Sequence, residues 1–318
     1  MSSERPENGS ISIMALESGI KYDSLDEAPD VPLLIEIIGI RPHDLAQLSH
    51  RFQIDLEDLQ DVQDLDERPR LQIEDNFTMI VFRVPVDLRK EEREYSTNPI
   101  GIFTNGKDII VIQNDEVPLR KERLRRRIRY STTVADVIYK WIEIVIHSFE
   151  TTLDLIEATI NETEEVIMSE IYPSQLEWFF QLSRDAVFME TSLKANMKVL
   201  RRLKRVPFLG RLILDDDRLE ELEVDLQQQV ELSAIYRELI ANAMSAYDSI
   251  VSHNLNRVIK TLTSISLLVS VPTLIASVYG MNVGLPLQHE PLAFVLVMLG
   301  SLSITLPLLL FLRRKGLV

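Results

Sequence analysis

The spacing of apolar and polar positions changes twice along the chain. From about residue 31 to residue 117, apolar residues form short runs between turn residues, and the runs are rich in β-branched side chains. Runs of this length and composition predict strands, here at 31–38, 77–84, 100–103 and 108–112. Asn105-Gly106, between the last two, predicts a hairpin turn. Short helices are expected at 41–50 and 55–61, so this segment is predicted to be a mixed α/β domain.

From Pro118 onward the spacing of apolar residues becomes helical. We expect helices from Thr133 to about Ser169 and from Ser174 to about Arg205, each beginning with a capping pattern. A third run, from Asp215 to Pro272, contains neither proline nor glycine before its end, and its apolar residues recur every three to four positions. A single helix from Asp217 to Asn282 would be roughly 100 Å long. Heptad-like spacing on so long a helix predicts that copies of it pack around a common axis.

Two uncharged segments near the C-terminus have the length of membrane spans. No charged residue lies between Lys260 and Glu290, and the run from Thr261 to Tyr279 nearly matches a hydrocarbon core of about 30 Å. The second segment, 291–312, follows a short loop, so the two helices are expected to form a hairpin. Lysine and arginine flank the hairpin at both ends and are missing from the loop. The positive-inside rule therefore predicts both termini in the cytoplasm and the loop outside.

The first uncharged segment carries an unusual number of hydroxyl side chains. Steps of three to five residues back from Asn282 give one stripe, which consists of Ser277, Thr273, Ser270, Ser266, Leu262 and Ile259. Its outer part is polar and uncharged and its inner part is aliphatic, as in a pore with a hydrophobic constriction that closes by dewetting. Two helices per chain cannot enclose water, so several chains would form a closed ring. The alternative is that the hydroxyls bond to carbonyls of their own helix.

The stripe ends in Tyr279-Gly280-Met281-Asn282, directly after the first predicted membrane helix. With the preceding residues 272–278 and the two-helix hairpin, this motif resembles the CorA family of divalent cation channels. Asp61-Val62-Gln63-Asp64 with Arg68-Pro69 is similar to that family's cytoplasmic domain. One difference is the outer loop, where 283–290 lacks the Pro-Glu-Leu segment that often follows the motif. The acidic residue that this segment supplies in the family is therefore displaced or missing here.

The resemblance implies a homo-oligomer, pentameric in this family, that conducts Mg²⁺, with Gly280, Met281 and Asn282 as the selectivity filter. Mg²⁺ keeps several waters when it is bound, and a ring of Asn282 amides would accept hydrogen bonds from those waters. Gly280 would allow close backbone approach at the mouth of the pore, and Met281 would pack the motif in place. The alternatives are a carrier of Co²⁺, Ni²⁺ or Zn²⁺ with the same fold, or a membrane-anchored scaffold or sensor.

The resemblance also implies that intracellular Mg²⁺ bound between neighbouring cytoplasmic domains favours the closed state. Carboxylates at the start of the long helix are the candidate ligands, facing Asp87 or Glu91 of an adjacent copy. They are Asp215, Asp216, Asp217, Glu220, Glu221, Glu223 and Asp225, and the strongest candidates are Asp217, Glu220, Glu221 and Asp225 with Asp87. The alternative is a helix-capping cluster and a solvated face.

Composition removes several other classes of function. The formal net charge is −15, so nucleic acid is not an expected partner, and the basic run 120–129 is interpreted as a solvated helix. There is no cysteine, which excludes disulfides and thiolate metal sites, and no Gly-rich ATP-binding loop is found. Glu143 and His147 lie four apart without an evident third metal ligand. No catalytic arrangement is recognisable and no leader is expected at the N-terminus.

The sequence therefore predicts an α+β protein of the cell membrane, inner or plasma, whose partners are the lipid bilayer and further copies of itself. We expect a cytoplasmic mixed α/β domain at 1–130 and a cytoplasmic helical stalk with one very long helix at 131–257. A pore-lining transmembrane helix at 258–282, an outer loop at 283–290, a second transmembrane helix at 291–312 and a basic tail at 313–318 complete the chain.

Overall fold

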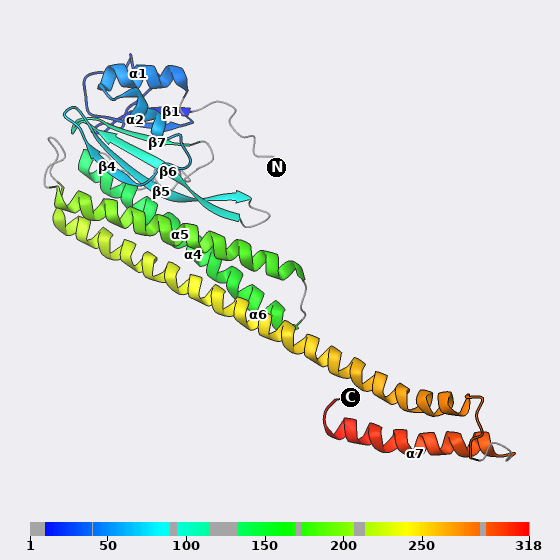
Figure 1. Cartoon of the computed structure of the whole chain (residues 1–318). Helices are drawn as coiled ribbons and strands as arrows, with labels where there is room; N and C mark the ends of the chain where they lie inside the picture. Colours follow the sequence, from blue (N-terminus) through cyan, green and yellow to red (C-terminus); the bar gives the residue numbers. More distant parts are fainter. Residues whose placement is uncertain are drawn as a thin grey trace. The chain divides into compact units, whose positions relative to one another are not determined.

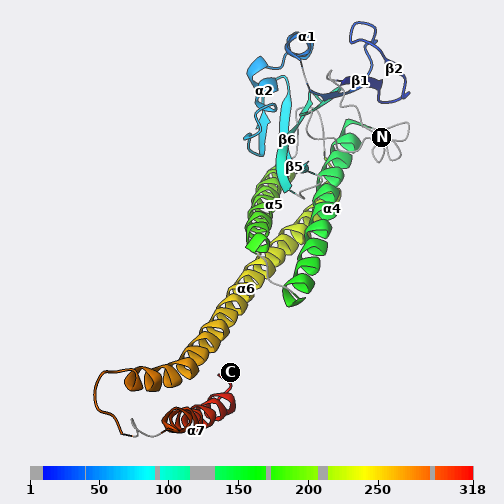
Figure 2. The same cartoon turned by 90° about the vertical axis from the view of Figure 1, so that its right-hand side faces the viewer.

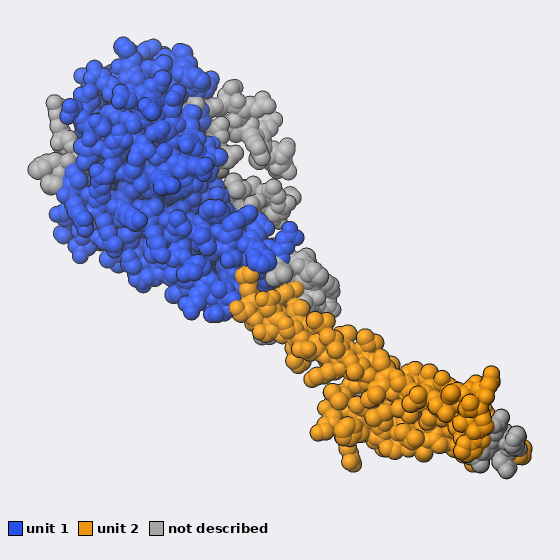
Figure 3. All heavy atoms as spheres, viewed as in Figure 1, with its two compact units in different colours: residues 1–242 blue, residues 243–318 orange. Residues whose placement is uncertain are grey.

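The structure is a computed structural model, and it describes residues 10–39, 41–89, 94–114, 133–169, 173–206, 214–286 and 291–317. The chain forms two compact units, residues 1–242 and residues 243–318 (Figure 3). The boundary between the units falls inside α6, the helix Asp216–Tyr279. The basic run 120–129, His289, Glu290 and Glu91 lie outside the described residues.

The first unit contains a seven-stranded sheet with the order β2-β1-β3-β7-β6-β5-β4. Its strands are β1 Ser10–Ala15, β2 Lys21–Tyr22, β3 Leu33–Ile38, β4 Arg70–Ile73, β5 Thr78–Arg89, β6 Glu94–Thr104 and β7 Ile109–Gln113. β3 and β7 pair in parallel, and the other neighbours are antiparallel. The predicted hairpin turn is confirmed between β6 and β7: Gly106 has a φ of 86°, a value that favours glycine.

Helices cover both faces of this sheet, α1 and α2 on one side and α4 and α5 on the other (Figures 1 and 2). Side chains alternate along each strand, so Met79 and Val81 of β5 pack in the core with α1 Pro42–Phe52 and α2 Leu56–Asp61. The alternate residues Ile80 and Phe82 of β5 are buried as well, on the face toward α4 Val134–Ser169 and α5 Pro173–Arg205. β5 and β7 are therefore buried on both faces, which explains their continuous hydrophobic runs.

Buried polar contacts fix α5 on the sheet. The Asn196 side chain accepts a hydrogen bond from the backbone N–H of Arg83 (2.9 Å) and donates one to its carbonyl (2.8 Å). Asp185, which is fully buried, accepts one from the backbone N–H of Tyr95 (2.9 Å). An amide that bonds both backbone groups of a strand residue holds the helix in one register on the sheet.

The first part of α6 packs beside α4 and α5 in the same unit. Leu219, Leu222 and Leu226 are nearly fully buried there. Arg218 is paired with Asp136 of α4 (Nη1 to Oδ1, 2.7 Å), and Arg201 of α5 with Glu223 (Nε to Oε1, 2.8 Å). Apolar contacts and ion pairs thus hold this part of α6 from two sides.

The second unit consists of the rest of α6 and of α7, Ala293–Arg314, which lie side by side (Figures 1 and 2). Both helices are long and apolar enough to cross a membrane by length and composition. The predicted hairpin is confirmed. The predicted helix end at Asn282 is wrong by one turn, because α6 ends at Tyr279 and residues 280–283 form bends and a turn.

Candidate functional site

The motif Gly280-Met281-Asn282 follows the last turn of α6 directly. The backbone N–H of Gly280 donates to the carbonyls of Ala276 (3.0 Å) and Ser277 (3.2 Å), and the N–H of Met281 donates to Val278 (3.2 Å). These bonds satisfy carbonyls that a helix end leaves without partners and tighten its last turn. The hydroxyl of Tyr279 donates to the carbonyl of Pro286 (3.4 Å), which ties the following loop back to the helix end.

Within the described part of the chain, the contacts of the motif do not require its particular residues. A Cβ added to Gly280 would meet the carbonyl oxygens of Ala276 and Ser277 at 3.4 Å, an ordinary contact. Met281 is 56% exposed among the described residues of one chain, and its expected packing role stays a prediction. Asn282 is exposed as well.

The membrane part of α6 has two opposite faces. The residues with reduced exposure lie on the face that packs toward α7, and they are Ser264, Leu268, Val271, Pro272 and Ile275. The six residues of the predicted stripe from Ile259 to Ser277 are all exposed. Because successive helical residues are rotated by about 100°, the two sets are centred on opposite sides of the helix. The structure thus brings all six predicted pore residues to one face and leaves this face uncovered.

Two hydroxyls of the stripe bond to their own helix, as the alternative reading of the sequence predicts. Ser270 Oγ donates to the carbonyl of Ser266 (2.7 Å), and Thr273 Oγ1 donates to the carbonyl of Val269 (2.8 Å). A hydroxyl that donates to a carbonyl keeps its acceptor lone pairs. Those lone pairs remain able to accept hydrogen bonds from the water shell of a cation, so the helix bonds and a polar wall are compatible.

The contact between α6 and α7 is closed by the C-terminal residues. Ser264, with 4% of its surface exposed, donates from Oγ to the carbonyl of Leu317 (3.0 Å). Leu317 in turn donates its backbone N–H to the carbonyl of Leu312 (3.1 Å), and Gly316 has a φ of 65°. This is the pattern of a Schellman C-cap. Sequence reasoning missed the role of Ser264, which is one of many hydroxyls on α6 and is distinguished only by its face.

The acidic residues at the start of α6 separate into two groups. Glu220 and Glu223 face basic residues of α5: Lys204 Nζ lies 3.3 Å from Glu220 Oε2, and Arg201 pairs with Glu223. The hydrogen bond from Arg201 is the main cause that holds the pKa of Glu223 below its ordinary value. Asp215 Oδ1 accepts from the backbone N–H of Asp217 (3.0 Å), as a capping residue does. Capping and pairing therefore account for part of this cluster.

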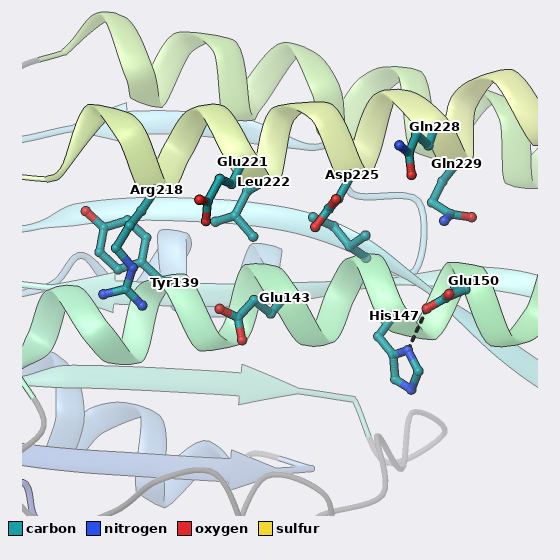
Figure 4. A pocket seen from close by; sticks show the side chains of 11 residues that line it. Tyr139, Glu143, His147, Glu150, Arg218, Glu221, Leu222, Asp225, Gln228 and Gln229 are labelled. Atoms are coloured by element: carbon teal, nitrogen blue, oxygen red, sulfur yellow. Dashed lines mark hydrogen bonds and ion pairs between the residues drawn. The ribbon is translucent and has the colours of Figure 1, made fainter.

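Glu221 and Asp225 belong to the second group, which lines a cavity of about 350 Å³ between α4 and α6. Glu143, His147 and Glu150 of α4 line the opposite wall, and His147 Nδ1 lies 2.8 Å from Glu150 Oε2 (Figure 4). Within the described ranges, no group of three or more histidine, aspartate or glutamate residues is placed to hold a metal ion. Asp87 lies on β5, but its side chain is outside what the structure describes. The cavity as a site was missed from the sequence, although Glu143 and His147 were noted as a pair.

An α/β unit that continues through a long helix into an apolar two-helix hairpin defines an integral membrane protein. The chain belongs to the family of CorA-like Mg²⁺ transporter proteins, whose family model matches residues 37–314. Members of this family are transporters and not enzymes, so the expected lack of a catalytic site is consistent with the family.

Two curated relatives match along most of the chain. The cobalt/magnesium transport protein CorA of Methanocaldococcus jannaschii is 27% identical over 313 residues, 95% of this chain and 98% of the relative. The cobalt/magnesium transport protein CorA of Thermotoga maritima is 24% identical over 79% of this chain and 73% of the relative. The complete structure of the CorA magnesium transporter from Methanocaldococcus jannaschii superposes with a TM-score of 0.84, covers 97% of this chain and 98% of that chain, and is 26% identical. The predicted fold class is thereby confirmed.

Proposed function

We propose that the chain transports divalent cations across a membrane, with Mg²⁺ and Co²⁺ as cargo. Family membership and the names of the relatives support this activity. Two helices of suitable length support membrane insertion. Ni²⁺ is a further candidate as cargo, and a carrier of Zn²⁺ with the same fold remains the alternative from the sequence.

The observation that carries the mechanism is the uncovered, uncharged stripe on the face of α6 opposite α7. If this helix faced lipid on all of its free surface, an apolar face would suffice. Instead the stripe has hydroxyls in its outer part and the aliphatic side chains of Leu262 and Ile259 at its inner end. We infer that several copies, five by the family resemblance, place these stripes around one water-filled path, with α7 of each copy toward lipid.

In this arrangement the Asn282 side chains form a ring at the outer mouth of the path. Their amide oxygens accept hydrogen bonds from the waters of Mg²⁺, which is reluctant to lose them. Gly280 and Met281 shape the filter, where close approach of neighbouring copies supplies the requirement for glycine that is missing within one chain. A divalent ion gains about 4.6 kcal/mol on moving inward across 100 mV, inside negative, so no ATP is needed.

The inner end of the path is the proposed gate. Leu262 and Ile259 of several copies would form an apolar constriction that dewets when it narrows. Intracellular Mg²⁺ bound at Asp87, Asp217, Glu220, Glu221 and Asp225 between copies would hold this constriction closed. The proposed site takes its ligands from two neighbouring copies.

The proposed topology follows from the charges that flank the hairpin. Both termini lie in the cytoplasm and residues 283–290 lie outside a cell membrane. In this topology the cytoplasmic parts are a domain at 1–130, a stalk at 131–257 and a basic tail at 313–318. The two membrane helices are at 258–282 and 291–312.

Uptake into liposomes tests the proposal. Purified protein is reconstituted, a Mg²⁺-sensitive dye is enclosed, and fluorescence is followed after Mg²⁺ is added with an inside-negative potential. We expect uptake with the unchanged chain and a loss of at least about tenfold with Asn282→Ala, since removal of a hydrogen bond to a charged, hydrated ligand costs about 1.5–3 kcal/mol. Asn254→Ala changes an exposed asparagine of α6 that lies before the uncharged segment; it is the matched control and should leave uptake unchanged.

Absence of uptake with the unchanged chain would support the scaffold or sensor instead of the transporter. Equal uptake with Asn282→Ala would remove the selectivity assignment but not the transport activity. A competition series with Co²⁺, Ni²⁺ and Zn²⁺ then ranks the cargo. Strong preference for Zn²⁺ would replace Mg²⁺ in the proposal.

A further inference from the structure

The cavity between α4 and α6 has the shape and lining of a binding groove. Glu221 and Asp225 extend from α6 toward α4, and Glu143 and Glu150 line the other wall (Figure 4). The lining therefore carries four carboxylates against one guanidinium, that of Arg218. Apolar surface is interleaved with these charges, from the Tyr139 ring and the side chains of Ile146 and Leu222. The groove is anionic with an apolar floor.

A buried amide in the same lining also lacks a partner. Gln229 is 7% exposed, and its Oε1 atom has no hydrogen-bond partner among the described residues. A buried acceptor without a partner costs free energy. This amide lines the groove beside Gln228 (Figure 4). An occupant with N–H donors would satisfy it.

The size and geometry of the groove do not fit a single metal ion. A volume of about 350 Å³ is far larger than one dehydrated ion requires. Among the described residues, the carboxylates of the groove do not form a group of three that could coordinate one metal ion. They are instead spaced along two helices, Glu221 and Asp225 four residues apart and Glu143 and Glu150 seven apart. Residues four apart rise about 6 Å along a helix. This is close to the separation of neighbouring ammonium groups in an extended polyamine.

One end of the groove already shows how the chain accommodates an organic cation. The Arg218 guanidinium carbon lies 4.1 Å from the centre of the Tyr139 ring, and its Nη1 lies 2.7 Å from Asp136 Oδ1. A cation on an aromatic face with a carboxylate beside it is a stable arrangement. The other carboxylates of the groove are partners of the same kind for further cationic groups along it.

We propose that the groove between α4 and α6 binds a linear aliphatic polyamine. Its ammonium groups pair with Asp225, Glu221 and Glu143, its methylene chain lies on Leu222 and Ile146, and an N–H group donates to Gln229 Oε1. This ligand class goes beyond the proposed transport of metal ions. The groove shares Glu221 and Asp225 with the proposed Mg²⁺-sensing carboxylates, so an occupant would also compete with that regulation.

Calorimetric titration of the purified full chain in detergent, with spermidine as the probe and without Mg²⁺, tests this proposal. We expect saturable binding of about one spermidine per chain, weakened at least about tenfold by Asp225→Asn or Glu143→Gln, because each loses a charge-assisted hydrogen bond. Glu238→Gln removes an exposed charge from the same helix outside the groove and should change the affinity by less than about twofold. Putrescine, which has fewer ammonium groups, should bind more weakly than spermidine.

Gln229→Leu separates a role in binding from a role in folding. Replacement of an unpartnered buried amide by an apolar side chain of similar size is neutral or stabilising for the free protein. We therefore expect weaker spermidine binding at an unchanged or higher melting temperature.

Two outcomes would overturn the proposal. Equal spermidine affinity for the groove variants and Glu238→Gln would show general ionic attraction. Absence of saturable spermidine binding, together with Mg²⁺ binding that the groove variants lose, would show a divalent metal site instead. Asn282→Ala should retain full spermidine binding while it loses ion uptake, so failure of the groove and failure of the transport proposal are distinguishable.

Discussion

The two parts of α6 have the same backbone conformation and opposite surroundings. Before residue 243 the helix is buried along one side, with Leu219, Leu226 and Ile240 at 1%, 1% and 0% exposure. From Leu255 to Leu262 its apolar residues are mostly uncovered, with Leu255 at 59% and Leu262 at 64%. One part therefore has its partners within the chain, whereas the other part has an apolar face that the described residues of the chain leave uncovered.

This difference revises what the repeated spacing along α6 means. Apolar residues every three to four positions predicted that copies pack around a common axis. In the structure the first such residues, up to Tyr247, are largely buried in their own chain, and the exposed ones begin at Val251. An axis shared between copies is therefore expected only for the later part of the helix. The same pattern of residues is thus buried in the first part of the helix and exposed in the later part.

The largest expected effect comes from removing one leucine from each part of α6. Leu226→Ala opens a cavity in a filled core and should lower the free energy of unfolding of the first unit by about 2–5 kcal/mol. Leu262→Ala removes an exposed side chain and should leave that unfolding free energy unchanged, while it widens the proposed constriction and raises ion uptake. Circular dichroism during chemical denaturation measures the first effect and the liposome assay the second. Equal destabilisation by both changes would contradict the comparison.

A smaller effect is expected from the ion pairs that hold the first part of α6 to α5. Glu190 of α5 accepts from Lys194 Nζ (2.6 Å) and from Arg237 Nε of α6 (2.6 Å), with 10% of its side chain exposed. Glu190→Gln leaves two cations facing a neutral amide and should cost about 1.5–3 kcal/mol of unfolding free energy. Glu238→Gln, at an exposed position of the same helix, should cost less than about 0.5 kcal/mol. An unchanged free energy of unfolding in Glu190→Gln would show that solvent screens both ion pairs of Glu190.

The elements that sequence reasoning predicted well are those whose residues signal their own conformation. Absence of proline and glycine after Asp215 correctly indicated the long helix, which begins at Asp216. Pro272 lies inside the helix, which continues past it to Tyr279 although a proline there removes a backbone hydrogen bond and crowds the preceding turn. The helix end was misjudged by three residues because the Gly280 position was assigned to the helix.

Features that depend on partners distant in sequence could not be predicted. The parallel pairing of β3 with β7 joins residues about 75 positions apart, as the bond from Leu33 N–H to Asp108 shows. The groove depends on α4 and α6 lying side by side, with Glu143 opposite Glu221. The stripe from Ile259 to Ser277 was predictable because it lies on one helix and follows from rotation alone. What the stripe faces is set by other copies and stays a proposal.

Acid should weaken the first unit through the loss of the Glu190 ion pairs. The pKa of Glu190 is held below its ordinary value of 4.5, chiefly by the hydrogen bond from Lys194 and also by Arg237. A carboxylate with a depressed pKa stabilises the folded state fully above 4.5, and this contribution is lost as the pH falls from there through the depressed value. Melting temperatures measured between pH 7 and pH 3 should therefore decrease once the pH is lower than about 4.5. The fall should be smaller in Glu190→Gln, and an equal fall in both chains would assign the acid sensitivity to other groups.

The smallest expected effect separates the two faces of the membrane part of α6. Ser264 lies on the packed face and donates to the Leu317 carbonyl, whereas Ser266, two residues on, lies on the exposed stripe. Ser264→Ala should lower the stability of the hairpin by about 0.6 kcal/mol, the average for hydrogen bonds between membrane helices, and should speed hydrogen exchange at residues 312–317. Ser266→Ala should leave this exchange unchanged and alter only the rate of ion uptake. Because both changes remove one hydroxyl from one helix, exchange that responded equally to the two would mean that α7 does not select a face of α6. The assignment of the opposite face to the pore would then lose its structural basis.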